Sequence, residues 1–182
     1  RLLLTGVVVA AGWGAVITFL LAVSPDQALR GMVFWLMGDL GQPELPLWEP
    51  VILLVGTLLA YLLAREINVL ARGGSQAAAF GVSVERLRLL LFLLASLLTA
   101  TAVTLAGSVG FVGLVVPHMI RLMGGSDHRL LVPASVLLGG GLLTLSDILA
   151  RTLLAPQQLP VGVVTALLGV PLFLYLLQRS GR

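Results

Sequence analysis

The residues of this chain that could do chemistry gather in one stretch, residues 107–129, which reads GSVGFVGLVVPHMIRLMGGSDHR. Glycines, a proline and ionisable side chains follow one another there at short intervals. They are Gly107, Gly110, Gly113, Pro117, His118, Arg121, Asp127 and His128. Polar and helix-breaking residues are costly in an otherwise apolar chain, so this stretch requires a structural or functional reason.

These side chains do not form a recognisable catalytic or metal-binding set. A metal site needs three or four converging N, O or S ligands, which His118, Arg121 and Asp127 do not supply in an evident geometry. The chain has no cysteine and no Gly-rich phosphate loop with a lysine, and its serines lack a partnered base. We therefore expect no enzyme, no metal site and no cofactor. For His118 we favour a structural hydrogen bond over a substrate contact.

The composition indicates an integral membrane protein. Hydrophobic residues make up 58% of the chain and charged residues only 10%, whereas soluble domains carry roughly 25% charged residues. The net charge of +3 comes from arginine, since the chain has no lysine. Loop arginines in membrane proteins usually set orientation. We therefore interpret the charge as a topology signal and expect no nucleic acid as a partner.

Charge-poor runs predict an all-α integral membrane fold with six transmembrane segments. About 20 apolar residues cross a bilayer as a helix, but the charge-free run from Leu89 to Ile120 has about 32 residues. The glycine series and Pro117 divide this run into a full helix and a short, broken crossing. The predicted segments are residues 2–23, 47–64, 85–106, 114–123, 130–150 and 161–178.

The arginines predict the orientation of these segments. If Arg1 is cytoplasmic and every segment crosses, nine of the eleven arginines are cytoplasmic, and only Arg30 and Arg151 face outward. If the short segment did not cross, Arg121 and Arg129 would also face outward. The positive-inside rule therefore favours a real though short crossing.

Two further patterns concern the ends of the predicted helices. On the cytoplasmic side, residues 65–86 read as two short helices: the Gly73-Gly74 pair ends the first, Ser75 can cap the second, and Gly81 can end it in the left-handed conformation. Spacing alone leaves a compact knob and an ordinary loop equally open. At the outer boundary, Asp147 and Arg151 stand four residues apart and can pair.

The 21 glycines have two interpretations. Small residues let membrane helices approach closely, and we favour such packing for residues 12–14, 107–113 and 139–141. The alternative is that broken helices around 107–117 line a translocation path, because irregular backbone at membrane depth is tolerated only against protein or a water-filled cavity.

The 107–129 stretch, followed by LLTLSDILARTLLAPQQLPVGVVTALLGVPLFLYLLQR, closely resembles the permease family of bacterial ABC importers for iron-siderophores, haem and vitamin B12. The resemblance implies a single permease domain over residues 1–182, similar to the last six of ten helices and incomplete at its N-terminus. It also implies the inner membrane, a second permease subunit (identical or paralogous), cytoplasmic ATP-binding subunits and a periplasmic substrate-binding protein.

The resemblance also implies roles for particular residues. Segment 65–86 matches the family's ATPase-coupling helices, and the residues that fit the pattern are Leu70, Gly73, Ala77, Gly81 and Val82. The chain departs from that pattern at Gly74 and Ser75, where acidic residues are usual, and at Ala78. Arg151 matches an outward arginine that meets a glutamate of the binding protein in the vitamin B12 importer. The first span matches a helix that lines the pathway, and Gly107, Gly110, Gly113 and Pro117 are the pathway or helix-break residues.

We therefore expect a permease subunit that carries an iron(III)-siderophore or a related metal chelate, such as haem or vitamin B12, driven by ATP on partner chains. The alternative is a secondary transporter or channel subunit that ATP does not drive. That alternative would require an ionisable residue deep in a span. None of the eight acidic residues lies there in the predicted topology.

Overall fold

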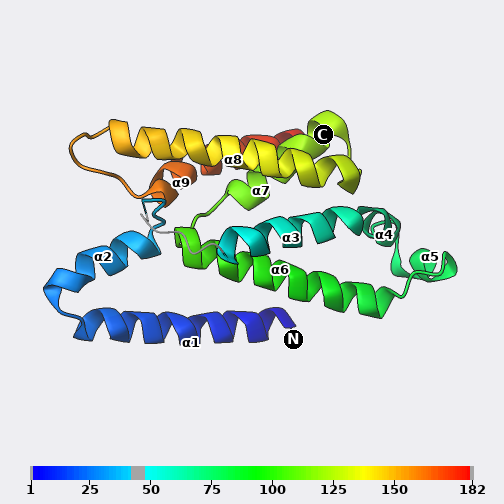
Figure 1. Ribbon diagram of the computed structural model, residues 1–182, viewed down its shortest axis with the longest axis horizontal. Helices are drawn as coiled ribbons and strands as arrows, with labels where there is room; N and C mark the ends of the chain where they lie inside the picture. Colours follow the sequence, from blue (N-terminus) through cyan, green and yellow to red (C-terminus); the bar gives the residue numbers. More distant parts are fainter. Residues whose placement is uncertain (1, 42–47, 181–182) are drawn as a thin grey trace.

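The computed structural model describes residues 2–41 and 48–180, and every regular element in these ranges is an α-helix (Figure 1). The elements are α1 (Leu2–Val23), α2 (Asp26–Leu36), α3 (Trp48–Leu62), α4 (Ala64–Leu70), α5 (Gly74–Ala79), α6 (Val84–Ala106), α7 (Val112–Gly124), α8 (His128–Thr152) and α9 (Val161–Ser180).

Within these ranges, three helices are individually long and apolar enough to cross a membrane: α1, α6 and α8. Helices α3 and α4 qualify together as a span bent by 54°. The apolar parts of α7 and α9 are shorter. The predicted short segment 114–123 lies inside α7, which begins two residues earlier, and the first residue of the predicted segment 47–64 lies outside the described residues.

The connections between the helices gather at two opposite ends of the molecule (Figure 1). At one end, Asp39 N donates to Ala106 O at 2.9 Å and Val161 N donates to Gly38 O at 3.0 Å, so the segment after α2 contacts the end of α6 and the start of α9. Helices α4 and α5 and the α7–α8 turn lie at the other end. These two groups are the segments that the arginine count assigns to opposite sides of the membrane.

The best-packed region lies where α7 contacts α8 and α9. Val116 and Ile120 of α7 form a buried cluster with Leu131 of α8. On α9, Val161 and Val164 are buried as well. Since lipid is as apolar as these side chains, van der Waals packing rather than the hydrophobic effect holds such helices together in a membrane.

Helix α1 stands apart from the other long helices (Figure 1). Its side chains are exposed from Leu4 to Leu20, including Trp13 at 66%. It meets α2 at a groove that Ile17, Leu20 and Trp35 help to line. A helix that is apolar on every side is suited to lipid or to other membrane helices rather than to water.

Candidate functional site

The predicted coupling segment, residues 65–86, forms two short helices separated by a glycine turn. Gly73 has φ +129°, a backbone conformation that L side chains rarely adopt. Helix α5 ends at Ala79 with Phe80 as its C-cap residue, and Gly81 follows with φ +81°. Gly81 N donates to Ala78 O and Val82 N donates to Ala77 O, both at 3.0 Å. These two bonds form a Schellman motif, so the predicted left-handed end at Gly81 is confirmed.

The predicted cap of this second short helix is wrong by two residues. Gly73 is the N-cap residue and makes no side-chain cap, and Gly74 is the first helical residue. Ala77 N donates to Gly73 O at 3.0 Å, which closes the first turn of the helix. Ser75 therefore lies inside the first turn and does not cap it, because the unusual Gly73 backbone already positions the helix start.

The five residues predicted for ATPase coupling differ in exposure. Ala77 is fully buried, Leu70, Gly73 and Val82 are half-buried, and Gly81 is exposed. These residues shape the turn and anchor α5 more than they form its outer surface. The large exposed hydrophobic side chain of the segment is Phe80, at 76%, which no sequence pattern singled out.

The α6–α7 break begins at Gly107, where three segments of backbone meet. Gly107 has φ +67°, and a Cβ there would overlap the carbonyl oxygen of Trp35. A Cβ on Gly162 would overlap the carbonyl oxygen of Met37, and a Cβ on Gly38 would lie 3.2 Å from Gly162 N. Only glycine permits this approach of α2, α6 and α9. The interpretation of Gly107 as a close-packing residue is therefore confirmed.

The other glycines singled out from the sequence do not pack closely within this chain. A Cβ on Gly110 or Gly113 would have no heavy atom of residues 2–41 or 48–180 within 4 Å, and a Cβ on Gly139 would make only an ordinary contact with Val112 at 3.8 Å. The further positions with open space are Gly12, Gly14, Gly140 and Gly141. Close packing inside this chain is thus wrong for the glycines with open space, because their faces point away from the helices described, whereas Gly139 is buried against α7 at ordinary contact distance.

The break ends at Phe111, the N-cap residue of α7. Its φ of +67° is unusual for a side chain with a Cβ and costs on the order of 1–3 kcal/mol. A Cβ on Gly169 of α9 would overlap Phe111 Cβ, so α9 holds Phe111 in place. Neither residue stood out in the sequence, because a lone glycine in an apolar helix carries no local signal.

Helix α7 then continues without interruption through Pro117, which is half-buried. The next residue, His118, places its ring edge-on to Phe173 of α9, with 6.4 Å between the ring centroids. His118 Nε2 is buried and has no hydrogen-bond partner in the described part of the chain. The predicted structural hydrogen bond is therefore wrong, because the ring meets an aromatic side chain that offers no acceptor.

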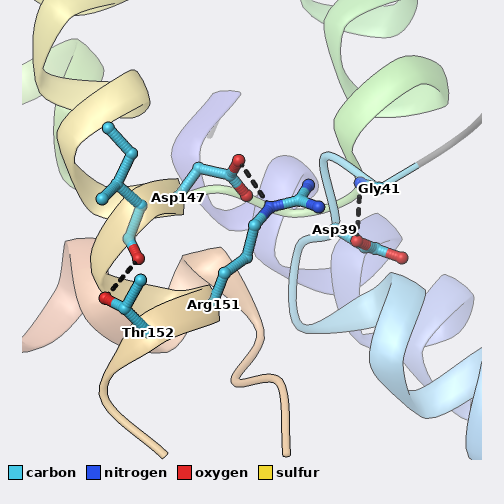
Figure 2. A network of polar contacts seen from close by, with 6 residues as sticks. Asp39, Gly41, Asp147, Arg151 and Thr152 are labelled. Atoms are coloured by element: carbon cyan, nitrogen blue, oxygen red, sulfur yellow. Dashed lines mark hydrogen bonds and ion pairs between the residues drawn. The ribbon is translucent and has the colours of Figure 1, made fainter. Parts of the chain in front are cut away.

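The predicted pair at the far end of α8 is confirmed. Arg151 Nε donates to Asp147 Oδ2 at 2.8 Å, and both side chains are partly exposed. Figure 2 shows the guanidinium of Arg151 between Asp147 and Asp39, which comes from the segment after α2. Asp39 Oδ1 accepts from Gly41 N at 2.8 Å, so this carboxylate is itself oriented.

At the opposite end of the molecule, Asn68 of α4 reaches the first turn of α8. Its Nδ2 donates to Asp127 Oδ1 at 2.6 Å, and its Oδ1 accepts from the backbone N–H of His128 at 2.9 Å. Asp127 is the N-cap residue of α8, and its Oδ1 also accepts from Arg129 N at 2.9 Å. Asn68 carries no signal in the sequence, because its partners lie about 60 residues further along the chain.

The hydrogen bonds around Asp127 act on its carboxyl group. The backbone N–H of Arg129, and then the Asn68 side chain, lower the pKa of Asp127 below its ordinary value of 3.8. Both donors favour the charged form.

In the described residues no group of three or more His, Cys, Asp or Glu side chains could hold a metal ion.

Comparison with known proteins identifies the family. The model of the FecCD transport family matches residues 1–179. The chain belongs to the FecCD transport family. It is 44% identical to the hemin transport system permease protein of Yersinia pestis, covering 100% of this chain and 56% of that protein. It is 44% identical to the cobalamin import system permease protein of Halobacterium salinarum, covering 97% and 48%.

A third relative is an uncharacterised ABC transporter permease protein of Bacillus subtilis, 42% identical over 100% of this chain and 52% of its own length. The chain therefore spans about half the length of the curated relatives it matches. These relatives are transport permeases rather than enzymes. Their likeness, together with the apolar helices, identifies a multi-pass protein of the inner membrane.

A solved structure shares the fold. It is an inward-facing conformation of an ABC transporter assigned to the metal-chelate type. The TM-score is 0.88 at 32% sequence identity, with 96% of this chain and 59% of that chain covered. The all-α ABC permease fold is thus shown by both sequence and structure.

Proposed function

We propose that this chain is part of the permease subunit of an ATP-driven importer. Its cargo would be an iron(III)-siderophore or a related metal chelate, such as haem or vitamin B12, carried across the inner membrane. The observation that carries this proposal is the match along the whole chain to permeases of hemin and cobalamin transport systems. The likeness to a transporter of the metal-chelate type supports the same class of cargo.

The coupling segment supports a role for cytoplasmic ATP-binding subunits. Residues 65–86 form two short helices, and the positive φ angles of Gly73 and Gly81 fix where the second helix begins and ends. The segment therefore has a defined surface, unlike a flexible loop. ATP would act by changing the affinity of the partner subunits for the two states of the permease. Hydrolysis would then take place on the partner chains, and not on this one.

The opposite end of the bundle supports docking of a periplasmic substrate-binding protein. The side chain of Arg151 is 42% exposed, and its guanidinium carries N–H donors from which a carboxylate of the partner could accept. Asp147 holds it at the end of α8 rather than within the bundle, and Asp39 lies on its other side (Figure 2). The role of Arg151 is that of a partner contact at the protein surface.

The α6–α7 break supports a pathway between this subunit and a second permease subunit. Gly110 and Gly113 have open faces, which fits the lining of a path better than it fits packing inside this chain. Helix α1 adds a long exposed apolar surface. The second subunit would be identical to this one or a paralogue of it.

The decisive experiment is reconstitution of the full-length subunit with its ATP-binding subunits and binding protein in proteoliposomes. Uptake of three probes is measured: a radiolabelled ferric hydroxamate siderophore, haemin and cyanocobalamin. We expect one of them to accumulate only when ATP is supplied to the ATP-binding subunits. An ATPase variant that lacks its phosphate-loop lysine is the control.

Two outcomes would contradict the proposal. Uptake that continues without ATP-binding subunits would favour a secondary transporter or channel subunit. In the described residues, Glu49 is the buried carboxylate that such a mechanism would have at hand, and it lies in the first turn of α3. Failure to accumulate any of the three probes would exclude the proposed class of cargo.

A further inference from the structure

Asn68 makes an almost complete set of hydrogen bonds between the coupling segment and α8. Its Oδ1 accepts from His128 N at 2.9 Å and lies 2.7 Å from His128 Nδ1, while its Nδ2 donates to Asp127 Oδ1 at 2.6 Å. An amide oxygen has two lone pairs, and both are used here. Because the Asn68 oxygen can only accept, His128 Nδ1 carries the proton in this contact.

The orientation of the Asn68 amide follows from its neighbours. A backbone N–H can only donate, so His128 N requires the oxygen of Asn68, and the Asp127 carboxylate requires its nitrogen. A flipped amide would place like groups against each other at both positions. This contact is therefore directional, unlike the apolar cluster in which α7 packs against α8.

The contact joins two elements, α4 and α8, that lie about 60 residues apart in the sequence. Helix α4 has only seven residues and follows a 54° bend after α3. Among the described residues, the side-chain hydrogen bonds that leave segment 65–86 are those of Asn68. They end on the first turn of α8, which the short 125–127 turn connects to α7. Val116 and Ile120 of α7 pack in turn against Leu131 of α8.

We propose that Asn68 is a positioning residue that makes the coupling segment and the start of α8 move as one body. A displacement of α4 and α5 then reaches α8 through hydrogen bonds of fixed direction, and it reaches α7 through the packing of α7 on α8. This inference rests on the proposed function, because it assigns to Asn68 the transmission of movement from the ATP-binding subunits. A purely structural role would be limited to accepting a hydrogen bond from a backbone N–H at the start of α8.

The first test compares variants of the full-length subunit in the reconstituted transporter. Asn68→Ala removes all the contacts. Asn68→Asp keeps an acceptor for His128 but places a second carboxylate against Asp127. The double variant Asn68→Asp/Asp127→Asn restores a donor and an acceptor in the reverse direction. Glu66→Gln is the matched control, since Glu66 is an exposed residue of α4 with no side-chain hydrogen bond in the described part of the chain.

The readout is the number of probe molecules imported per ATP hydrolysed, with the transported probe chosen from ferric hydroxamate, haemin and cyanocobalamin. We expect Asn68→Ala and Asn68→Asp to lower this ratio about fivefold or more, the factor given by losing one net hydrogen bond, while hydrolysis continues. The reciprocal double variant should recover most of the ratio. Glu66→Gln should leave it unchanged.

A second test addresses movement as one body. Asn68→Cys/Asp127→Cys is prepared in a background where any other cysteine of the subunit is replaced by serine, and the thiols are joined with a short bifunctional reagent. The tether replaces the native contact, so we expect the joined protein to import more per ATP than the same variant before joining. Import that stops on joining would show that the contact must open, and would overturn the inference.

The remaining outcomes separate this inference from the proposed function. If the wild-type transporter shows no ATP-dependent uptake, both the proposed function and this inference are contradicted. If the wild type transports and Asn68→Ala keeps its transport ratio, only the inference is overturned. An equal fall of uptake and hydrolysis, together with a lower melting temperature, would likewise reduce Asn68 to a structural residue.

Discussion

On helix α8, Arg151 Nε donates a hydrogen bond to Asp147 Oδ2 at 2.8 Å, one turn earlier in the same helix. Arg151 therefore does not lie at the surface with all its donors free. Its remaining guanidinium nitrogens point away from Asp147 and towards the side of Asp39 (Figure 2). A carboxylate on a docking protein would bind these nitrogens while Asp147 keeps the side chain in place.

Arg151→Ala should weaken docking of the substrate-binding protein about tenfold or more, because hydrogen bonds to charged groups contribute ~1.5–3 kcal/mol. The measurement is the Kd of the binding protein for the full-length subunit in nanodiscs. Arg30→Ala is the matched control, since Arg30 is the other arginine predicted to face outward and is exposed on α2. Equal effects of the two substitutions would point to general charge attraction and against a specific contact.

Asp147→Asn should change docking in the opposite direction or leave it unchanged. The pair is partly exposed and contributes about 0–1 kcal/mol, so removing the competing charge can tighten docking by about fivefold at most. The same nanodisc measurement detects this, and raising the salt concentration should reduce the difference. A loss of affinity comparable with that of Arg151→Ala would mean that Asp147 itself contacts the partner.

Gly81→Val should uncouple ATP hydrolysis from uptake in the complete transporter. Valine at φ +81° costs about 1–2 kcal/mol, so the end of α5 would shift and the bond from Val82 N to Ala77 O would be lost. The measurement is import per ATP hydrolysed. Gly74→Ala is the control, because Gly74 is helical and a Cβ there makes only an ordinary contact, 3.5 Å from the Arg88 side chain.

Local patterns in the sequence predicted those features whose cause is itself local. The left-handed end at Gly81 and the Asp147–Arg151 pair follow from backbone preference and helical spacing, and both are present. The predicted cap at Ser75 failed because Gly73, two residues earlier, determines where α5 starts. Local rules thus work until a neighbouring residue supplies a stronger constraint.

Features that depend on tertiary contact were beyond such rules. Asn68 meets Asp127 across 59 residues, and no spacing pattern marks that pair. Gly162 and Gly169 are each lone glycines in an apolar helix, yet a Cβ on either would overlap another segment of the chain. The more conspicuous glycines at 12, 14 and 139–141 have open faces or ordinary contacts instead. Apart from Gly107, glycine density in the sequence therefore did not locate the close approaches.

Gly107→Ala and Gly110→Ala should differ sharply in stability, although the two glycines belong to the same sequence motif. A Cβ on Gly107 overlaps the Trp35 carbonyl at a positive φ, whereas a Cβ on Gly110 meets nothing within 4 Å. We expect a loss of about 2–4 kcal/mol for Gly107→Ala and less than about 1 kcal/mol for Gly110→Ala. The measurement is thermal unfolding of the purified full-length subunit in detergent.

The transport assay gives Gly110→Ala a second use. If the open face of Gly110 lines the pathway, bulkier residues there should reduce uptake progressively from Ala to Val to Phe while the unfolding temperature stays nearly constant. Uptake that is insensitive to the size of residue 110 would contradict a pathway lining at this position.

Acid should weaken the junction between α4 and α8 through Asp127. The Arg129 backbone N–H and the Asn68 side chain lower the pKa of Asp127 in the folded protein below 3.8, its ordinary value. A lowered folded pKa means that the stabilisation is fully present well above pH 3.8 and is lost as pH falls through the folded pKa. Near neutral pH, Asp127→Asn should therefore lower the unfolding temperature, and below about pH 3.8 the difference from the wild type should shrink.

Asn68→Ala provides the matched control for this titration, because it removes one of the two donors that lower the pKa of Asp127. In that background the pH-dependent effect of Asp127→Asn should be smaller, since the Arg129 N–H alone still favours the charged form of the carboxyl group. The unfolding temperature is measured from about pH 7 downward for the wild type, the two single variants and the double variant, because the groups involved titrate below that pH. A pH-dependent effect of Asp127→Asn that is the same with and without Asn68 would show that the two side chains are not coupled.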